Sequence, residues 1–363
     1  MKLKKYHKQL TAICMLLLMF IIIILFSFDY FPANSKKKRN TSAESYDIAL
    51  ITYDSMDDSY IDIIRDGIEN SSDALGKTYQ IFNTSDYGNS YYDTIKAAAG
   101  KSSLVILPDS TFEEAVYSSQ TYYVNTYFML IDGIPHNADY SDSTINYNVI
   151  PMSYDESEAG FLAGYASVYD DNKNLCFICD ETNQKSLHYC YGFLQGADYA
   201  SSKNSQTDVS VSIIYENKDE EFTDSISDGT QIIAATSDKA VSHILKDSKT
   251  KNIPLINCDE HTTGDENIMA SATKNIGPTV NDTILDFFYN QVKGGTTLKF
   301  NTSNNGVSLV FEKNAFTKFD EDAYKSIYKS LSTQEISIIS DTTVSPEDLG
   351  LTNITINVED TVN

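Results

Sequence analysis

Short apolar runs alternate with helix-like segments from about residue 46 onward. The runs have the length of buried strands, and between them apolar residues recur at helical spacing, as at Ile61, Ile64 and Ile68. The predicted strands lie at 48–53, 78–83, 103–107 and 127–131, and the predicted helices lie at 57–70, 89–99 and 111–122. This alternation predicts βαβ units and therefore a parallel sheet with right-handed crossovers.

The same alternation returns in the second half of the chain. Strands are predicted at 175–179, 209–215, 230–235 and 253–257, and helices at 186–202, 219–227 and 238–248. The order then changes to a strand at 267–272, a helix at 277–293, a hairpin at 297–312 and a helix at about 319–332. The hairpin turns at Asn304-Asn-Gly306, a strong turn signal. This change of order indicates segments that cross between two lobes.

One helix rich in small residues, 155–169, lies between the two halves. It begins with the acids Asp155, Glu156 and Glu158, which a helix N-terminus favours. Its glycines and alanines predict very close packing, which we expect to be against a sheet. We therefore predict an α/β protein with two doubly wound parallel-sheet lobes joined by hinge strands.

The predicted order of strands and helices also places the domain boundaries. The first lobe is expected to comprise 46–133 and about 270–300. The second lobe is expected to comprise 134–269 and about 301–340, followed by a C-terminal tail at 341–363.

An uncharged apolar segment at 10–28 precedes the lobes and a polar linker at 29–45. At 1.5 Å per residue it spans roughly 28 Å, close to the hydrocarbon thickness of a bilayer. The lysines within 1–9 favour a cytoplasmic N-terminus. We expect a single-pass anchor in the cell membrane with an extracytoplasmic domain. The alternative is a cleaved signal peptide with a small-residue site at Ala33-Asn-Ser35.

The charge of the chain is distributed unevenly. Residues 1–40 hold eight basic residues and one acid, which leaves 19 basic and 50 acidic residues and a formal net charge of −31 for the rest. Phosphate binding requires a basic surface, so nucleic acid is not expected as a partner. The charge indicates a soluble, self-repelling exterior.

The cysteine spacing resembles a redox or metal motif only at Cys176-Phe-Ile-Cys179. On a strand these two residues point to opposite faces with Cα atoms ~10 Å apart, too far for a disulfide. We expect small buried side chains, although pairings that involve Cys190 and Cys258 stay open. No spacing predicts a metal site, and no cofactor is expected.

Four motifs in order resemble one known family. They are Ala159-Gly-Phe-Leu-Ala-Gly-Tyr-Ala166, Tyr191-Gly-Phe-Leu-Gln-Gly-Ala197, Ile256-Asn-Cys-Asp259 and Met269-Ala-Ser-Ala-Thr-Lys274. Together they resemble the basic membrane protein family of extracytoplasmic receptors, which includes purine nucleoside receptors. The resemblance covers roughly 46–312 and implies the type I periplasmic-binding-protein fold.

The resemblance also implies a ligand site. Tyr60 and Phe222 would stack on the two faces of a nucleobase, and Asp132 would address the base edge. Asp259 and Lys274 would bind ribose hydroxyls or a base. The other positions that match family ligand elements are Asp57, Ser59 and Asp224.

General chemistry is compatible with these roles, because strand-end residues of α/β sheets face the ligand crevice. Each residue also has an ordinary structural interpretation. Strand-end aspartates often cap helices, Tyr60 can be a core aromatic, and Lys274 can be a solvated surface residue.

Two segments depart from the family pattern. Pro108-Asp-Ser-Thr-Phe112 and Ala234-Ala-Thr-Ser237 stand where glycine-rich turns are typical, and glycine allows a close approach of the backbone to a ligand. The ligand can therefore differ from a nucleoside, or binding can be lost.

Three function classes follow. The main hypothesis is a membrane-tethered solute-binding receptor for a purine nucleoside or similar molecule, which closes by hinge motion and delivers its ligand to an ABC transporter permease without chemistry. The alternative is a ligand-sensing regulatory surface protein with a membrane partner. An extracellular hydrolase or transferase is disfavoured, since no nucleophile elbow, zinc motif or phosphate loop is present in the sequence.

Overall fold

The computed structural model describes residues 45–216, 222–247, 249–258 and 267–359. The predicted membrane segment at 10–28 lies outside these ranges. Within them, no helix combines the length and the apolar character that crossing a bilayer requires.

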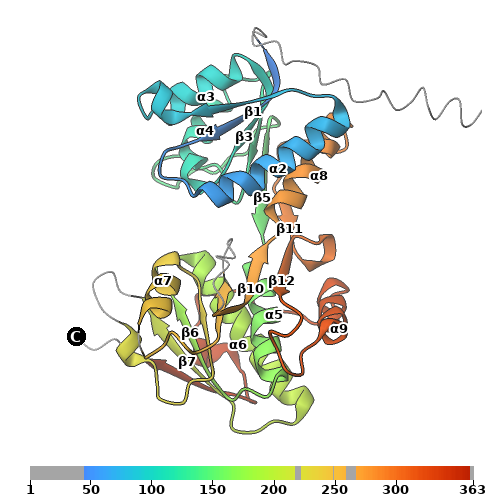
Figure 1. Ribbon diagram of the computed structural model, residues 1–363. Helices are drawn as coiled ribbons and strands as arrows, with labels where there is room; N and C mark the ends of the chain where they lie inside the picture. Colours follow the sequence, from blue (N-terminus) through green and yellow to red (C-terminus); the bar gives the residue numbers. More distant parts are fainter. Residues whose placement is uncertain (1–44, 217–221, 248, 259–266, 360–363) are drawn as a thin grey trace, which may run out of the picture. The chain divides into compact units, whose positions relative to one another are not determined.

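A six-stranded sheet forms the first lobe (Figure 1), in the order β11-β5-β4-β3-β1-β2. Its described strands are all parallel to their neighbours. The strands are β1 (Tyr46–Thr52), β2 (Tyr79–Asn83), β3 (Ser102–Leu107), β4 (Tyr127–Leu130), β5 (Val149–Tyr154) and β11 (Leu298–Phe300). The helices of this lobe are α2 (Asp58–Leu75), α3 (Tyr91–Ala99), α4 (Glu113–Ser119) and α8 (Ile276–Phe288), with short 3₁₀ turns η1 (Thr84–Tyr87) and η2 (Ser110–Phe112).

A seven-stranded sheet forms the second lobe, in the order β12-β10-β9-β8-β6-β7-β13. The strands are β6 (Asn174–Cys179), β7 (Ser210–Tyr215), β8 (Ile232–Ala235), β9 (Leu255–Cys258), β10 (Ile268–Lys274), β12 (Val307–Phe311) and β13 (Thr355–Glu359). The helices are α5 (Glu156–Tyr169), α6 (Gln184–Asn204), α7 (Asp238–Lys246) and α9 (Glu321–Ser332), with η3 (Phe222–Ser225), η4 (Thr302–Asn304) and η5 (Pro346–Leu349). This sheet is parallel except at one edge, where β12 runs antiparallel to β10. The predicted α/β class with parallel sheets in two lobes is confirmed.

The chain crosses between the two sheets three times. The crossings follow β5, β10 and β11, because β6, β11 and β12 each lie in the other sheet. The predicted hairpin at 297–312 is therefore wrong. Its turn forms, with Asn305 in the left-handed conformation at φ 57°, but β11 pairs with β5 and β12 pairs with β10.

The sheets also differ from the expected domain boundaries. β5 pairs with β4 in the first sheet, although the second lobe was expected to start at 134. β10 pairs with β9 in the second sheet, although 270–300 was expected in the first lobe. Of that segment, α8 and β11 do belong to the first lobe.

The first of these differences has a physical cause in the connection between β4 and β5. This connection contains no helix, and the expected boundary at 134 falls within it. Side chains hold this loop instead. Asp142 accepts a hydrogen bond from the Tyr117 hydroxyl at 2.6 Å, and Gln120 bonds both the Thr144 carbonyl and the Asn146 amide.

Helices α5 and α6 touch backbone to backbone. A Cβ atom placed on Gly160 would lie 2.1 Å from the Tyr189 carbonyl oxygen, and one on Gly164 would lie 2.0 Å from that of Phe193. Gly192 and Gly196 meet carbonyls of α5 in the same way. The prediction of close packing by small residues is thus confirmed, but these glycines approach a helix and not a sheet.

The four described cysteines lie in two apolar cores: Cys176 in one, and Cys179, Cys190 and Cys258 in the other. Cys176 packs with one face of the second sheet and Cys179 with the other, as expected for residues at i and i+3 of a strand. The four cysteines among the described residues are buried.

Replacement of Gly164 by alanine tests the contact between the two helices. The added methyl group has no room against the Phe193 carbonyl, so Gly164→Ala should lower the free energy of unfolding by about 1–3 kcal/mol or more. Denaturant unfolding of the full chain measures this. Gly100→Ala is the control, since Gly100 has a right-handed helical backbone and its nearest neighbour would be 3.4 Å away. Equal stability of the two variants would contradict the account.

Candidate functional site

A cavity of about 270 Å³ lies where the two sheets direct the carboxyl ends of their strands. Parallel α/β sheets bind ligands at this edge. Loops after β3, β4 and β8, the end of β10 and the start of α6 supply its side chains. The described lining residues are Asp109, Ser110, Asp132, Asn183, Lys185, Ser186, Tyr189, Thr236 and Lys274.

Asp132 is the central carboxylate of this cavity. It follows β4, it is only 6% exposed, and its φ of 53° is left-handed, a conformation that is uncommon outside glycine and clusters at functional sites. Two lysines donate to the same oxygen, Oδ2: Lys274 at 2.7 Å and Lys185 at 2.5 Å. Among the described residues, none donates a hydrogen bond to the other oxygen, Oδ1.

Lys274 also contacts a second buried carboxylate. Its ammonium lies 3.2 Å from Glu156 Oε1, at the start of α5, and its side chain is 2% exposed. His188 Nδ1 lies 3.6 Å from the other Glu156 oxygen. Burial alone would raise the pKa of Glu156, but the attraction of Lys274 and the His188 hydrogen bond outweigh it and lower that pKa to about 2.

Hydroxyl and carboxylate groups line the rest of the cavity. Asp109 accepts a hydrogen bond from the Tyr53 hydroxyl at 2.7 Å. Burial and this carboxylate raise the pKa of Tyr53 to about 12. The hydroxyls of Ser186 and Thr236 bond each other, and Ser186 also accepts from the Asp180 amide at 2.9 Å.

The structure brings together two of the predicted site residues, Asp132 and Lys274. Asp57 and Ser59 are exposed at the start of α2, where the Asp57 carboxylate accepts from the Ser59 and Tyr60 amides as a helix cap. Asp224 is exposed on η3.

The two predicted stacking rings lie in different cores. Tyr60 is buried, and its hydroxyl donates to the Pro108 carbonyl at 2.8 Å. Phe222 is buried in the second lobe with its ring centre 5.3 Å from that of His243. Neither ring is among the described lining residues of the cavity. Asp259 lies outside the described residues.

Sequence reasoning missed the other described lining residues of the cavity and also Glu156, which contacts Lys274. These lining residues are Asp109, Ser110, Asn183, Lys185, Ser186, Tyr189 and Thr236. Glu156 was visible only as an acid at a helix start. Lys185 and Tyr189 stand just before the Gly-Phe motif at 191–197, and only their place at the start of a helix that follows a strand could have indicated them.

Comparison with protein-family models shows the family of this chain. The family model described as Bmp, ABC transporter substrate-binding protein PnrA-like, matches residues 47–347. The chain belongs to this family. Bmp proteins bind substrates for ABC transporters and are not enzymes. No protein with a curated description matches the sequence.

Solved structures share the fold of this Bmp protein at low sequence identity. A solute-binding protein of an ABC transporter system from Aeropyrum pernix K1 has a TM-score of 0.62 at 13% identity, over 82% of this chain and 94% of that one. One from Conexibacter woesei DSM 14684 has 0.59 at 16%, over 82% and 99%. A transcriptional activator of the comK gene from Bacillus halodurans has 0.60 at 13%, over 83% and 99%.

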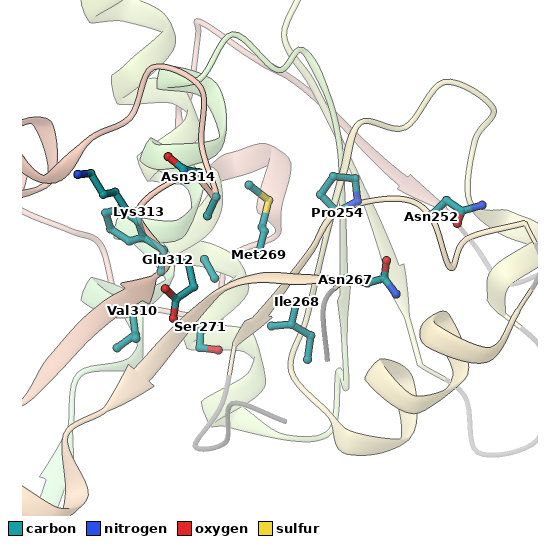
Figure 2. A pocket seen from close by; sticks show the side chains of 13 residues that line it. Asn252, Pro254, Asn267, Ile268, Met269, Ser271, Val310, Glu312, Lys313 and Asn314 are labelled. Carbon is teal, nitrogen blue, oxygen red and sulfur yellow. The ribbon is translucent and has the colours of Figure 1, made fainter. Parts of the chain in front are cut away.

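A larger hollow of about 700 Å³ lies elsewhere in this Bmp protein (Figure 2), beside the first residues of β9 and β10 and the end of β12. Figure 2 labels Pro254, Ile268, Met269, Val310 and Lys313 among its side chains. It lies at the opposite ends of β9 and β10 from the cavity at Asp132. The smaller cavity lies at the carboxyl ends of the strands, where parallel α/β sheets bind ligands. We therefore take it as the ligand site although the other hollow is larger.

Metal binding finds no support in the described ranges, where no group of three or more His, Cys, Asp or Glu side chains could hold an ion.

The ion pair of Lys274 with Glu156 should appear in the acid stability of the protein. The pKa of Glu156 is lower in the folded state than its ordinary value of 4.5. The pair therefore stabilises the fold above about pH 4.5, and this contribution is lost as the pH falls toward 2.

Lys274→Met removes the partner and leaves a buried carboxylate. We expect a loss of about 3–5 kcal/mol in the free energy of unfolding at pH 7, and a smaller difference from the parent below pH 4. Urea unfolding across pH 2–8 measures both, with Lys299→Met, an exposed lysine, as the control. A parent-like stability at pH 7 would refute the pairing.

Proposed function

We propose that this Bmp protein is a membrane-tethered extracytoplasmic receptor that binds a purine nucleoside or a similar small polar molecule. It closes over the ligand by hinge motion and delivers it to an ABC transporter permease, without chemistry. The observation that carries this proposal is the pairing of Asp132 with Lys274 in a cavity at the strand ends.

The chemistry of the cavity suits a ligand that donates and accepts hydrogen bonds. Asp132 Oδ1 can accept from a base N–H group or a ribose hydroxyl, and Ser110, Ser186 and Thr236 offer hydroxyls. The described lining holds two aspartates and two lysines, and the carboxylate of Glu156 behind Lys274 adds a further negative charge, so the site carries no excess of positive charge. This charge distribution favours a neutral polar ligand over an anion.

The size of the cavity and its one described aromatic side chain also favour a small ligand. Its volume of about 270 Å³ lies near the lower limit of roughly 300–1,000 Å³ for ligand pockets, which excludes large ligands. Tyr189 is the aromatic residue among the described lining residues, and because it is only 2% exposed it contributes apolar surface to the wall of the cavity. Tyr60 and Phe222 would reach a ligand only if their cores rearranged.

Delivery to a transporter fits the three crossings between the sheets. Crossings that follow β5, β10 and β11 allow the lobes to rotate about short segments while each sheet stays intact. The apolar segment at 10–28 would keep the receptor at the cell membrane, near a permease.

A thermal shift experiment with the full chain tests the nucleoside proposal. A ligand that binds only the folded state raises the melting temperature, with about 2.7 kcal/mol of stabilisation at 100 times its Kd. We expect a shift with at least one purine nucleoside in a panel of nucleosides, free bases and sugars. Asp132→Asn should abolish the shift, whereas Asp73→Asn, an exposed control on α2, should keep it.

The outcomes separate the possibilities. A shift with sugars alone would replace the nucleoside by another solute. No shift with any member of the panel would refute the nucleoside assignment.

A regulatory surface protein is the second candidate. Two observations favour it: glycine-rich turns are absent at 108–112 and 234–237, and a transcriptional activator shares the fold with a TM-score of 0.60. Uptake of labelled nucleoside by cells that lack this chain distinguishes the two. Unchanged uptake despite tight binding in vitro would favour sensing over transport.

A further inference from the structure

Lys185 connects the second lobe to the central carboxylate of the first. It lies in the first turn of α6, and its ammonium donates to Asp132 Oδ2 at 2.5 Å and to the Asp132 main-chain carbonyl at 2.7 Å. Asp132 follows β4 of the other sheet. Two hydrogen bonds from one ammonium therefore hold both the side chain and the backbone of a residue across the cavity.

The two lysines on Asp132 are not equivalent. Lys274 is the last residue of β10, directly before the crossing to α8, and Glu156 also holds it. It stays close to Asp132 if the lobes rotate about the crossings. The side chain of Lys185 is 39% exposed and is carried by a helix of the second lobe. Its contact is the one that lobe separation would break.

The geometry at Asp132 gives this contact a consequence for the ligand. Both ammonium groups take Oδ2, which restricts rotation of the carboxylate and leaves Oδ1 without a donor among the described residues. A fixed acceptor binds a donor at a lower entropic cost than a rotating one.

We propose that Lys185 is a positioning residue of the ligand site, which couples closure of the lobes to presentation of Asp132 Oδ1. The inference rests on the proposed function, because it assumes that Oδ1 accepts a hydrogen bond from a bound nucleoside-like ligand. In the open protein Asp132 retains Lys274 alone. In the closed protein Lys185 completes the site, so closure and ligand binding stabilise each other.

Distance measurements between the lobes test the contact without any ligand. Spin labels on Thr121→Cys and Ser202→Cys, in the full chain with Cys14→Ser, report the separation by double electron–electron resonance. Both positions are exposed, whereas the cysteines at 176, 179, 190 and 258 are buried. Lys185→Met should shift the distribution to longer distances.

A higher salt concentration should also lengthen the distance between the spin labels in the parent. Raising the ionic strength from 0.01 M to 1 M shortens the screening length from about 30 Å to about 3 Å, which weakens a partly exposed ion pair. The distribution of the parent should lengthen with salt, and that of Lys185→Met should respond less.

Binding measurements test the positioning role. Lys185→Met should weaken binding of the nucleoside that shifts the melting temperature by about tenfold, as expected for a lost charge-assisted hydrogen bond. Lys185→Arg should restore much of the affinity, since it keeps the charge. Lys203→Met, near the other end of α6, is the matched control and should bind like the parent.

Three results would overturn the proposal, and two of them concern Lys185→Met: a ligand-free distance distribution identical to that of the parent, or an unchanged affinity. Loss of affinity in Lys203→Met to the same extent would also overturn it, because the effect would then be general to the helix. If no nucleoside binds the parent, the proposed function fails, and the distance measurement still decides whether Lys185 holds the lobes together.

Discussion

The buried ammonium of Lys274 is the interaction on which the site depends. Its side chain is 2% exposed and lies between Asp132 of the first lobe and Glu156 at the start of α5. Moving an ammonium and its partners out of water costs several kcal/mol per ion, and only good geometry with further hydrogen bonds offsets that cost. Lys185 donates such a bond to Asp132, and His188 lies 3.6 Å from Oε2 of Glu156, whereas Lys274 contacts Oε1, so each buried carboxylate has a second polar neighbour.

The contact between α5 and α6 fixes the second-lobe side of this network. Glu156 begins α5, while Lys185 and His188 lie in the first turns of α6. Gly160 and Gly192 let the two backbones touch near these ends, so neither helix can slide without a clash. A glycine contact that contains no polar chemistry thereby determines the spacing of the charged groups at the cavity.

Much of the fold could be predicted because strand and helix periodicity depend on local sequence. The runs at 48–53 and 103–107 form β1 and β3, and the small residues of 155–169 identify a close contact. The partner of that contact could not be predicted, because glycine spacing indicates close packing but not which element packs there. The expected boundary at 134 differs from the sheets because the connection between β4 and β5 is a loop held by side chains, and β5 still pairs with β4.

Only the site residues that lie at or just after the end of a strand could be predicted from the sequence. Asp132 follows β4 and Lys274 ends β10, and the structure places the Lys274 ammonium 2.7 Å from Asp132 Oδ2. Tyr60 and Phe222 matched a motif, but burial depends on tertiary packing, and each ring fills a core. Lys185 belongs to no motif, and its role depends on a contact between lobes that no local pattern encodes.

A crystal structure of the chain with the purine nucleoside that raises its melting temperature most tests the central claim directly. We predict a ligand donor within hydrogen-bond distance of Asp132 Oδ1, with Lys274 still bound to Oδ2. A nucleoside bound away from Asp132, for example in the hollow beside β12, or a Lys274 separated from Asp132, would contradict the account.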